Sequence, residues 1–369
     1  MNKVGEAAPE RRIPLAMLAQ STQTIFNSAV IDLPRVCVFE NVHDYDDRFA
    51  MHLLRDIYCP RRVTFPPVLL AQLPPGVTVH GNFQYLTTLD AQFLDEQFHY
   101  EAHPPIAAQA LASAIPAVHI NEDALLLARY GAGTWGHWLG ELVPRALVAE
   151  MAAPGKFKYV IPEELGTVTS RNFIEALEAY GIGEDRLIRI GRRHRYVFER
   201  LSTVSAVWIY PYAIHPAALS LLRTAFKAPL PVAPRGTGAC AMLRFEGHGR
   251  HISNLDEIIS LLKIRGFSAF EIGALPFVQQ VSLFREAGAL FGVLGSNLTG
   301  MVFSPLEVKT VSAAPGAWGD CFFHGLVQAQ EGFYADLRGT PPPGQKNTMT
   351  TPFNLPVRRL ADALDALGL

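Results

Sequence analysis

The chain has 369 residues, of which 49% are hydrophobic, and its formal net charge at pH 7 is -2. A chain of this length normally divides its core between two domains, and the balanced charge excludes the strongly basic surface typical of nucleic-acid partners. Every apolar stretch falls short of the roughly twenty residues that a membrane span requires, so no transmembrane segment is predicted.

The first twelve residues contain charges of both signs and lack the apolar run of a secretory signal. The four cysteines are scattered without Cys-x-x-Cys spacing, which argues against a zinc ribbon or a disulfide framework and is typical of a reducing compartment. We therefore expect a cytoplasmic protein, which can also lie peripherally at the inner face of the membrane.

In the first part of the chain, residues 31–120 contain short apolar runs between proline-rich breaks, which predicts an irregular, strand-rich region. Strands and helices then alternate. The pattern predicts strands at 124–128, 157–161, 186–190 and 201–210, the last as one strand or two, and helices at 137–151, 172–180 and 215–227.

Residues 228–238 are rich in proline and glycine, and they mark the expected domain boundary. Beyond it, strict alternation of strand and helix predicts a parallel sheet with helices on both faces. The expected strands are 240–245, 268–272, 289–294, 308–313 and 333–337, and the expected helices are 255–265, 277–287, a short one from 298, and 321–330. Asn254 and Glu257 have the spacing of a capping box at the first of these helices.

This pattern divides the chain into three parts. Residues 1–230 form an N-terminal domain, with the irregular region at 1–120 and an α/β part at 121–230. Residues 231–340 form a Rossmann-like domain, and residues 341–369 form a tail whose short helix, 360–367, docks back on the first domain.

An apolar strand ends at Gly295-Ser296-Asn297 and leads directly into a predicted helix. Backbone N–H groups at a helix start carry partial positive charge, and ligands of parallel sheets gather where strands end. The loop is therefore predicted to bind an anion such as a diphosphate. The alternative is that Gly295 and Gly300 only permit close packing of the strand and the helix.

Gly131, Gly133 and Gly136 form a Gly-x-Gly-x-x-Gly match between a strand and a helix. A dinucleotide site is nevertheless disfavoured, because no acidic residue ends the next strand and Trp135 would crowd the loop. If it were such a site, the protein would be an oxidoreductase with bound NAD.

In the predicted helix that follows, His137, Glu141 and Arg145 recur at intervals of four and share one face. A histidine near a glutamate suits a general base, whereas the alternative is a salt-linked helix with no chemistry. Pro144 removes a backbone N–H and is expected to bend this helix.

Arg244 and Arg250 follow the first strand of the second half, and their guanidinium forks suit phosphate oxygens; surface pairing with neighbouring carboxylates is the alternative. Asp44 and Asp46 have Asp-x-Asp spacing, which holds a divalent cation in some sugar-nucleotide enzymes, and an acidic turn is the simpler interpretation. His248 and His251 lack clustered carboxylates, so no metal site is predicted and a divalent metal is not favoured.

Three blocks together resemble glycosyltransferase family 61, whose bacterial members are often labelled capsular polysaccharide biosynthesis proteins. They are the Gly-His-Trp block at 136–145, the segment 243–254 with Arg244 and Arg250, and residues 281–303, which include the glycine loop. The resemblance spans roughly residues 120–340. It implies an α/β, GT-B-like fold, in which two Rossmann-like domains face a cleft.

The resemblance also implies an inverting transfer of a hexosyl or pentosyl group from a nucleotide sugar to a hydroxyl of a polysaccharide or glycan acceptor, which can be lipid-linked. The donor phosphates would be bound by the second domain, and the N-terminal domain, 1–230, would be the acceptor side. His137 and Glu141 would lie at the cleft, where one of them takes the acceptor proton. The implied donor-binding residues are Arg244, Arg250, Gly295, Ser296, Asn297 and Thr299. No cofactor beyond the donor is implied, and a homo-oligomer is compatible with it.

One departure concerns the loop. Family members commonly read His-Gly-Ala-Gly-Leu-Thr, whereas this chain reads Leu294-Gly-Ser-Asn-Leu-Thr299. Three outcomes remain open: Asn297 replaces the missing contact, the donor differs, or transfer is lost. The last outcome gives the alternative function, an inactive GT-B-shaped scaffold in polysaccharide biosynthesis.

Overall fold

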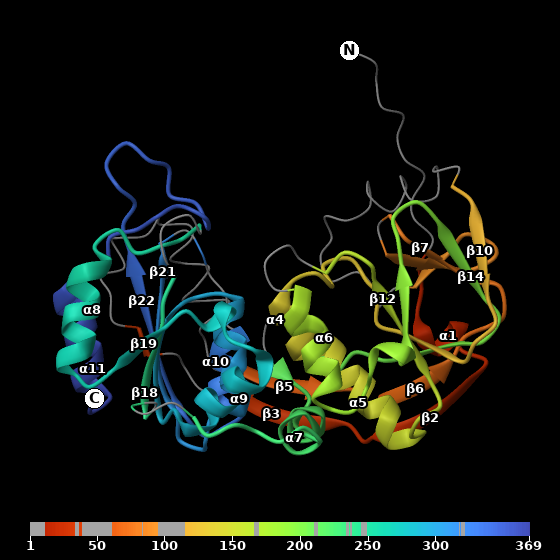
Figure 1. The fold of residues 1–369 in the computed structure, drawn as a ribbon, viewed down its shortest axis with the longest axis horizontal. Coiled ribbons are helices and arrows are strands. Elements are labelled where there is room, and N and C mark those ends of the chain that lie inside the picture. Colours follow the sequence, from red (N-terminus) through yellow and green to blue (C-terminus); the bar gives the residue numbers. More distant parts are fainter. Residues whose placement is uncertain are drawn as a thin grey trace, which may run out of the picture. The chain divides into compact units, whose positions relative to one another are not determined.

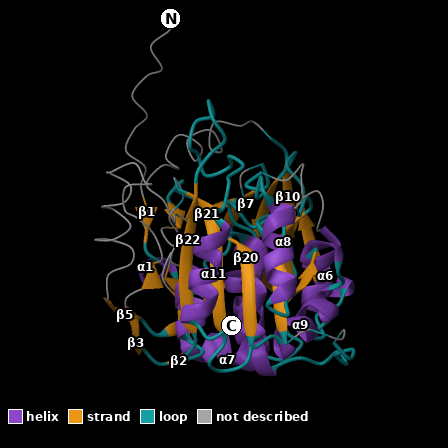
Figure 2. Ribbon diagram, turned by 90° about the vertical axis from the view of Figure 1, so that its left-hand side faces the viewer, coloured by secondary structure: helices purple, strands orange, loops and turns teal. Residues whose placement is uncertain are grey.

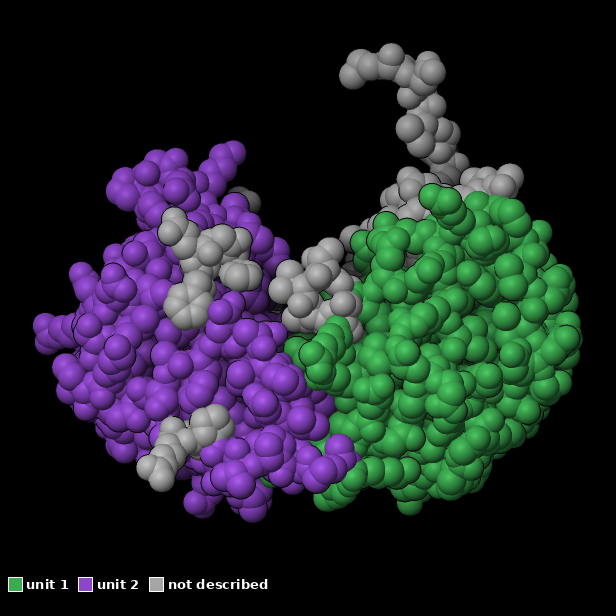
Figure 3. All heavy atoms as spheres, in the orientation of Figure 1, with its two compact units in different colours: residues 1–29, 65–208, 217–227 green, residues 30–64, 209–216, 228–369 purple. Residues whose placement is uncertain are grey.

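A computed structural model of the protein describes residues 12–33, 37–38, 61–82, 84–94, 115–165, 170–209, 213–233, 236, 238–244, 249–316, 318 and 322–369. The chain divides into two units (Figure 3). The first unit comprises residues 1–29, 65–208 and 217–227, and the second comprises residues 30–64, 209–216 and 228–369.

Within the described part of the first unit, two six-stranded sheets follow the orders β1-β9-β8-β7-β14-β10 and β13-β12-β11-β15-β6-β2. Apolar side chains of both sheets, such as Val79, Leu126 and Phe198, form one buried cluster. The strands are β1 (Arg12–Ile13), β2 (Ser21–Phe26), β6 (Val68–Gln72), β7 (Val77–His80), β8 (Tyr85–Thr87), β9 (Phe93–Leu94), β10 (Ala117–Ile120), β11 (Ala124–Leu126), β12 (Lys158–Pro162), β13 (Leu187–Ile190), β14 (Arg195–Phe198) and β15 (Leu201–Val204).

Both sheets of the first unit are mixed. In the second sheet, β11 and β13 run parallel to β12, whereas β15 and β2 run antiparallel to β6. The unit is therefore α/β, but it lacks the wholly parallel sheet of a simple Rossmann-like domain, because the strand-rich N-terminal region contributes antiparallel strands to it.

The helices of the first unit include one continuous run from Trp135 to Ala152. Its middle is a π-turn in which the Val143 N–H donates to the Trp138 carbonyl, five residues earlier. Pro144 has no N–H to donate to Gly140, and the wider turn accommodates that loss. The helices are α1 (Leu15–Leu18), α4 (Trp135–His137), the π-turn η4 (Trp138–Leu142), α5 (Val143–Ala152), α6 (Ser170–Glu178), the 3₁₀ turn η5 (Glu184–Arg186) and α7 (Pro216–Thr224).

The second unit contains the parallel sheet predicted from the alternation, with strand order β19-β18-β20-β21-β22-β4. Figure 1 shows α8 and α11 on one side of this sheet and α9 and α10 on the other, and Figure 2 shows α8 and α11 in front of the strands. The elements are β4 (Cys37–Val38), β18 (Ala239–Met242), α8 (Leu255–Ile264), β19 (Ser268–Phe270), the 3₁₀ turn η6 (Ile272–Ala274), α9 (Phe277–Glu286), β20 (Ala289–Val293), the 3₁₀ helix η7 (Ser296–Phe303), β21 (Lys309–Pro315), α10 (Phe322–Gln328), β22 (Phe333–Gly339) and α11 (Val357–Ala366).

Two short ladders complete the described strands. One pairs β3 (Ala29–Leu33) with β5 (Arg61–Phe65), and the other pairs β16 (Trp208–Ile209) with β17 (Ala213–Ile214). The region predicted as one strand or two over 201–210 is therefore two strands, β15 and β16. No helix in the described ranges has both the length and the apolar character that crossing a bilayer requires.

The predicted docking of the C-terminal helix, α11, on the first domain is wrong. The helix instead packs on α8 and β22 of the second unit. Its apolar face, which includes Leu360 and Leu364, is buried in the same cluster as Ile258 and Leu262 of α8. Residues 30–64 also belong to the second unit, where β4 pairs with β22, although the sequence predicts them in the first domain.

The capping box predicted at Asn254 is also wrong, because the Asn254 side chain makes no hydrogen bond to the helix backbone. Its Nδ2 donates to the Leu355 carbonyl over 2.9 Å and to Glu257 Oε2 over 3.2 Å, while its Oδ1 accepts from the Leu355 N–H over 3.0 Å. Asn254 therefore ties the segment before α8 to the segment that leads into α11.

His324 of α10 makes the stability of the second unit sensitive to acid. Its side chain is buried beside the Tyr334 ring, and burial lowers its pKa from 6.5 to about 4. Between these two pH values His324 binds a proton in the unfolded chain but not in the folded chain. The free energy of unfolding therefore falls as the pH falls through this window.

We expect the free energy of unfolding to drop by about 2 kcal/mol more between pH 7 and pH 5 in the wild type than in His324→Phe. Urea unfolding at both pH values measures the difference, and the comparison cancels the carboxylates that the two proteins share. Equal losses in the two proteins would contradict a buried neutral histidine at this position.

Candidate functional site

The glycine loop lies at the carboxyl end of β20, in the middle of the parallel sheet. Gly295 has φ 148° and ψ -180°, a backbone conformation that is essentially restricted to glycine, and η7 begins at the next residue. This conformation turns the chain from β20 into η7 and brings the backbone close to the side chains that surround it.

Two arginines converge on this loop, as predicted. A Cβ atom built on Gly295 would lie 2.9 Å from Nη2 of Arg244 and 3.0 Å from Nη2 of Arg250. Arg244 comes two residues after β18, which pairs directly with β20, so the two neighbouring strands place it beside Gly295. Two guanidinium groups and a helix start thus meet at one edge of the sheet, and this combination is suited to binding a phosphate.

Arg244 is half-buried. Burial lowers the pKa of its guanidinium from the ordinary value, and Nη1 donates to the Gly249 carbonyl over 3.4 Å. Among the described residues, its buried Nε has no hydrogen-bond partner. A cation held in such surroundings is stabilised by an anionic ligand more strongly than one in open water.

Arg250 is fixed at both ends. Its backbone has φ 68°, which is rare for a non-glycine residue, and its N–H donates to the Thr350 carbonyl over 2.9 Å. Its guanidinium carbon lies 3.9 Å from the centroid of the Trp318 ring. Trp318 is absent from the residues predicted for the site, because its ring approaches Arg250 only through the fold.

The remaining loop residues differ in exposure. Ser296 and Asn297 are half-buried in the first turn of η7, whereas Thr299 is fully buried. In the described structure the Thr299 hydroxyl has no hydrogen-bond partner. The side chain of Thr299 therefore belongs to the interior beneath the loop, while Ser296 and Asn297 lie nearer the surface.

The first unit holds a second cluster of charged residues around Glu141. Glu141 is 1% exposed and pairs with two arginines, Arg145 over 2.8 Å and Arg129 at hydrogen-bond distance. The helix spacing that predicts the neighbourhood of His137, Glu141 and Arg145 is confirmed, since His137 Nδ1 lies 4.0 Å from Glu141 Oε2.

Arg129 is the member of this cluster that the sequence does not predict. It stands three residues after β11, and its Nη2 lies 3.0 Å from His137 Nδ1 and also donates to Glu141. A guanidinium can only donate, so Nδ1 of His137 must accept, and the proton of the neutral ring lies on Nε2. The sequence does give one indication of its role, because Arg129 is a single charged residue that follows an apolar strand.

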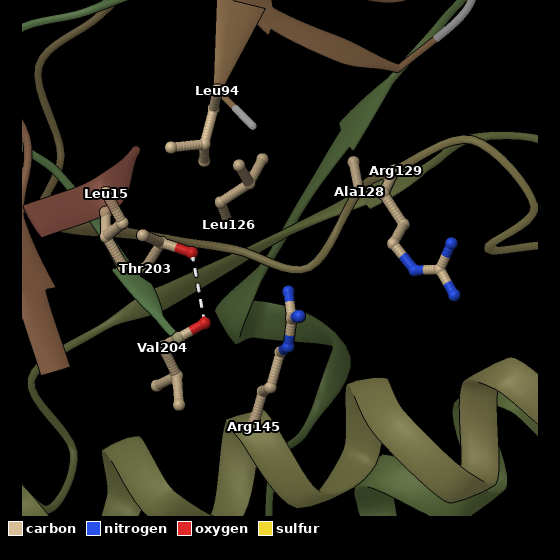
Figure 4. Close-up of a pocket in the computed structure, with 8 residues that line it drawn as sticks. All are labelled: Leu15, Leu94, Leu126, Ala128, Arg129, Arg145, Thr203 and Val204. Atoms are coloured by element: carbon tan, nitrogen blue, oxygen red, sulfur yellow. Dashed lines mark hydrogen bonds between the residues drawn. The ribbon is translucent and has the colours of Figure 1, made fainter. Parts of the chain in front are cut away.

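A cavity of about 10 Å³ adjoins the two arginines (Figure 4), which is room for about one water molecule. Arg129 and Arg145 line it together with apolar side chains from both sheets, including Leu94 and Leu126. It is too small for a sugar or a nucleotide. The Gly131 turn lies beside the same cluster, since a Cβ on Gly131 would be 3.8 Å from both Arg129 and His137.

The structure does not test the candidate metal residues. Asp44, Asp46 and His248 lie outside the described residues. Within the ranges that the structure does describe, no three His, Cys, Asp or Glu side chains are grouped as a metal site would require.

Comparison with known proteins finds a match to one protein family. A family model described as Glycosyltransferase 61 matches residues 135–311. No curated protein is significantly similar to the chain. Among solved structures, TibC from enterotoxigenic E. coli H10407, described as a bacterial iron-containing dodecameric glycosyltransferase, is 11% identical, with 68% of this chain and 76% of that chain covered and a TM-score of 0.29.

The segment matched by the family model contains His137, Glu141 and Arg145 in the first unit and Arg244, Arg250 and the Gly295 loop in the second, while Arg129 precedes it. These residues carry the resemblance noted in the sequence, and the match confirms it: residues 135–311 are similar to glycosyltransferase family 61.

Proposed function

We propose that the protein is an inverting, GT-B-like glycosyltransferase that moves a sugar from a nucleotide sugar to a hydroxyl of a polysaccharide or glycan acceptor. A bond forms between the acceptor oxygen and the anomeric carbon. The bond from that carbon to the donor phosphate breaks, the nucleoside diphosphate leaves with the electron pair, and the acceptor hydroxyl loses its proton. The family match supports the transfer of a sugar, and the two arginines at Gly295 support a donor that carries phosphate.

The observation that carries this proposal is the convergence of Arg244 and Arg250 on Gly295. The charge that develops on the leaving diphosphate is stabilised by donors already in place, which is the usual source of the largest rate effect. Two guanidinium groups and the first N–H groups of η7 supply positive charge without a metal ion, so we propose metal-independent transfer. Ser296 and Asn297 would contact the same phosphates.

On the acceptor side, we propose that His137 meets the hydroxyl and that Glu141 holds the cluster together. Both Glu141 oxygens are engaged by arginines, and protonating the carboxylate would leave two buried cations without their counter-ion. In the described state His137 offers Nε2–H, which is a donor. To take the acceptor proton, Nδ1 must exchange its contact with Arg129 for one with the hydroxyl.

Calorimetric titration of the purified protein with a panel of sugar nucleotides and UDP tests the donor site. We expect at least one ligand to bind, and Arg244→Ala and Arg250→Ala each to weaken its binding by about 10-fold to 100-fold, since a hydrogen bond to a charged group is lost. Arg358→Ala, which removes an exposed guanidinium from α11, is the matched control and should bind normally. No binding across the panel would count against the proposal.

A second function, an inactive scaffold with the same fold, is favoured by the position of Leu294. This residue replaces the histidine common in the family and is fully buried, while its N–H donates to the Ala313 carbonyl in the sheet. Leu294 has no polar side-chain group that could bind a sugar-nucleotide donor. Release of free nucleoside diphosphate in the presence of an acceptor separates the two functions, because a scaffold would bind its partners and release none.

A further inference from the structure

The aromatic face of Trp318 supports Arg250 from one side. The guanidinium carbon of Arg250 lies 3.9 Å from the ring centroid, close enough for a cation–π contact. An arginine stacked by its face keeps its N–H groups in the plane of the guanidinium, where they can still bind an oxygen anion. The contact therefore restrains the Arg250 guanidinium from one side.

The backbone of Trp318 is tied to the end of a strand. Trp318 follows β21, the neighbour of β20, and its backbone N–H donates to the Pro315 carbonyl over 3.1 Å. Trp318 thus lies close to the last residue of β21, at the same edge of the sheet as Gly295. The pairing of β20 with β21 therefore fixes the positions of both Trp318 and the glycine loop.

The opposite end of Arg250 is held by its backbone, which has a positive φ and a hydrogen bond to Thr350. A long flexible side chain normally loses considerable rotamer entropy when it binds a ligand. Here the backbone and the ring fix it in advance, and its Nη2 already lies beside Gly295. Such preorganisation raises affinity by lowering the entropy cost of binding.

We propose that Trp318 is the positioning residue of the diphosphate site. It holds Arg250 in the orientation in which the guanidinium N–H groups of Arg250 bind a phosphate at Gly295. This inference rests on the proposed function for the identity of the ligand. It adds a residue from the segment that follows β21 to a site otherwise built from the segments that follow β18 and β20. It also makes position 250 specific for arginine, because the point charge of a lysine cannot both stack flat and present a fork.

A double-mutant cycle between Trp318 and Arg250 tests the inference, with inorganic pyrophosphate and UDP as the two probes in calorimetry. We expect Trp318→Leu to weaken pyrophosphate binding by about 5-fold to 10-fold in the wild-type background and to have almost no effect in the Arg250→Ala background. Trp318→Phe keeps an aromatic face and should recover most of the affinity. Phe333→Leu removes an exposed ring at the amino end of β22 and should change nothing.

The outcomes separate this inference from the proposed function. Equal losses in both Arg250 backgrounds, or failure of Trp318→Phe to recover binding, would overturn the positioning role. Pyrophosphate binding with the expected coupling, but no binding of UDP or any sugar nucleotide, would overturn the proposed donor and leave Trp318 in its role. A wild-type protein that binds neither probe would overturn both.

Discussion

Replacing Gly295 by alanine is expected to abolish nucleotide binding while the protein remains folded. Gly295 has a φ of 148°, which a residue with a side chain rarely adopts, and the new methyl group would lie 2.9 Å from Arg244 Nη2 and 3.0 Å from Arg250 Nη2. Both guanidinium groups would have to move away from the loop, and the backbone would resist its present conformation. We expect the affinity for the best-bound sugar nucleotide, or for UDP, to fall by more than about 100-fold, since two charged contacts are displaced together.

Gly273→Ala is the matched control for this substitution. Gly273 lies in the same unit, its backbone has no positive φ, and an added Cβ would meet open space. It should bind the nucleotide like the wild type. Unfolding in urea, measured for both variants, shows whether the binding comparison is made on folded protein. Retention of wild-type affinity in folded Gly295→Ala would show that the arginines and the loop do not act together.

The architecture of the second unit could be predicted because its signals are local. Parallel strands covered on both faces form uninterrupted apolar runs, and the predicted strands 289–294 and 333–337 lie within two residues of β20 and β22. Helices bounded by glycine and proline were located equally well. The carboxyl edge of a parallel sheet then fixes where loops gather, so Arg244 and Gly295 could be placed together without a structure.

Long-range pairing could not be read from local patterns. The basic segment 189–195 leads into β14, whose Tyr196 and Phe198 are buried between β7 and β10, partners more than seventy residues away. Likewise, Asn254 resembles a helix cap locally, but it binds Leu355 a hundred residues later. The same reason explains why Trp318 was missed, because its ring reaches Arg250, 68 residues earlier, only through the fold. Arg129 was missed for another reason: it lies in the turn before the helix, only 8 residues from His137, where helical spacing gives no guide to its contacts.

The charge cluster of the first unit yields the largest expected effect on stability. Glu141 is buried between Arg129 and Arg145, and the three side chains are at most 8% exposed. Replacing Glu141 by glutamine preserves its shape but removes the negative charge, so two buried cations remain without compensation. Because breaking a buried ion pair from one side is costly, we expect Glu141→Gln to lower the free energy of unfolding by about 3–5 kcal/mol. Urea unfolding monitored by circular dichroism measures the loss.

Glu184→Gln provides the matched comparison, since Glu184 makes the same kind of pair with Arg189 at the surface, where the two side chains are 65% and 39% exposed. Solvent screens that pair, and its loss should cost less than about 1 kcal/mol. If the two substitutions have equal effects, the Glu141 cluster does not hold the first unit together. A large loss at Glu141 would instead imply that His137 owes its orientation to the same ion pairs, because Arg129 contacts both His137 and Glu141. Activity lost through Glu141→Gln would then reflect the displacement of Arg129 and His137, whereas a proton-accepting carboxylate would lose activity without loss of stability.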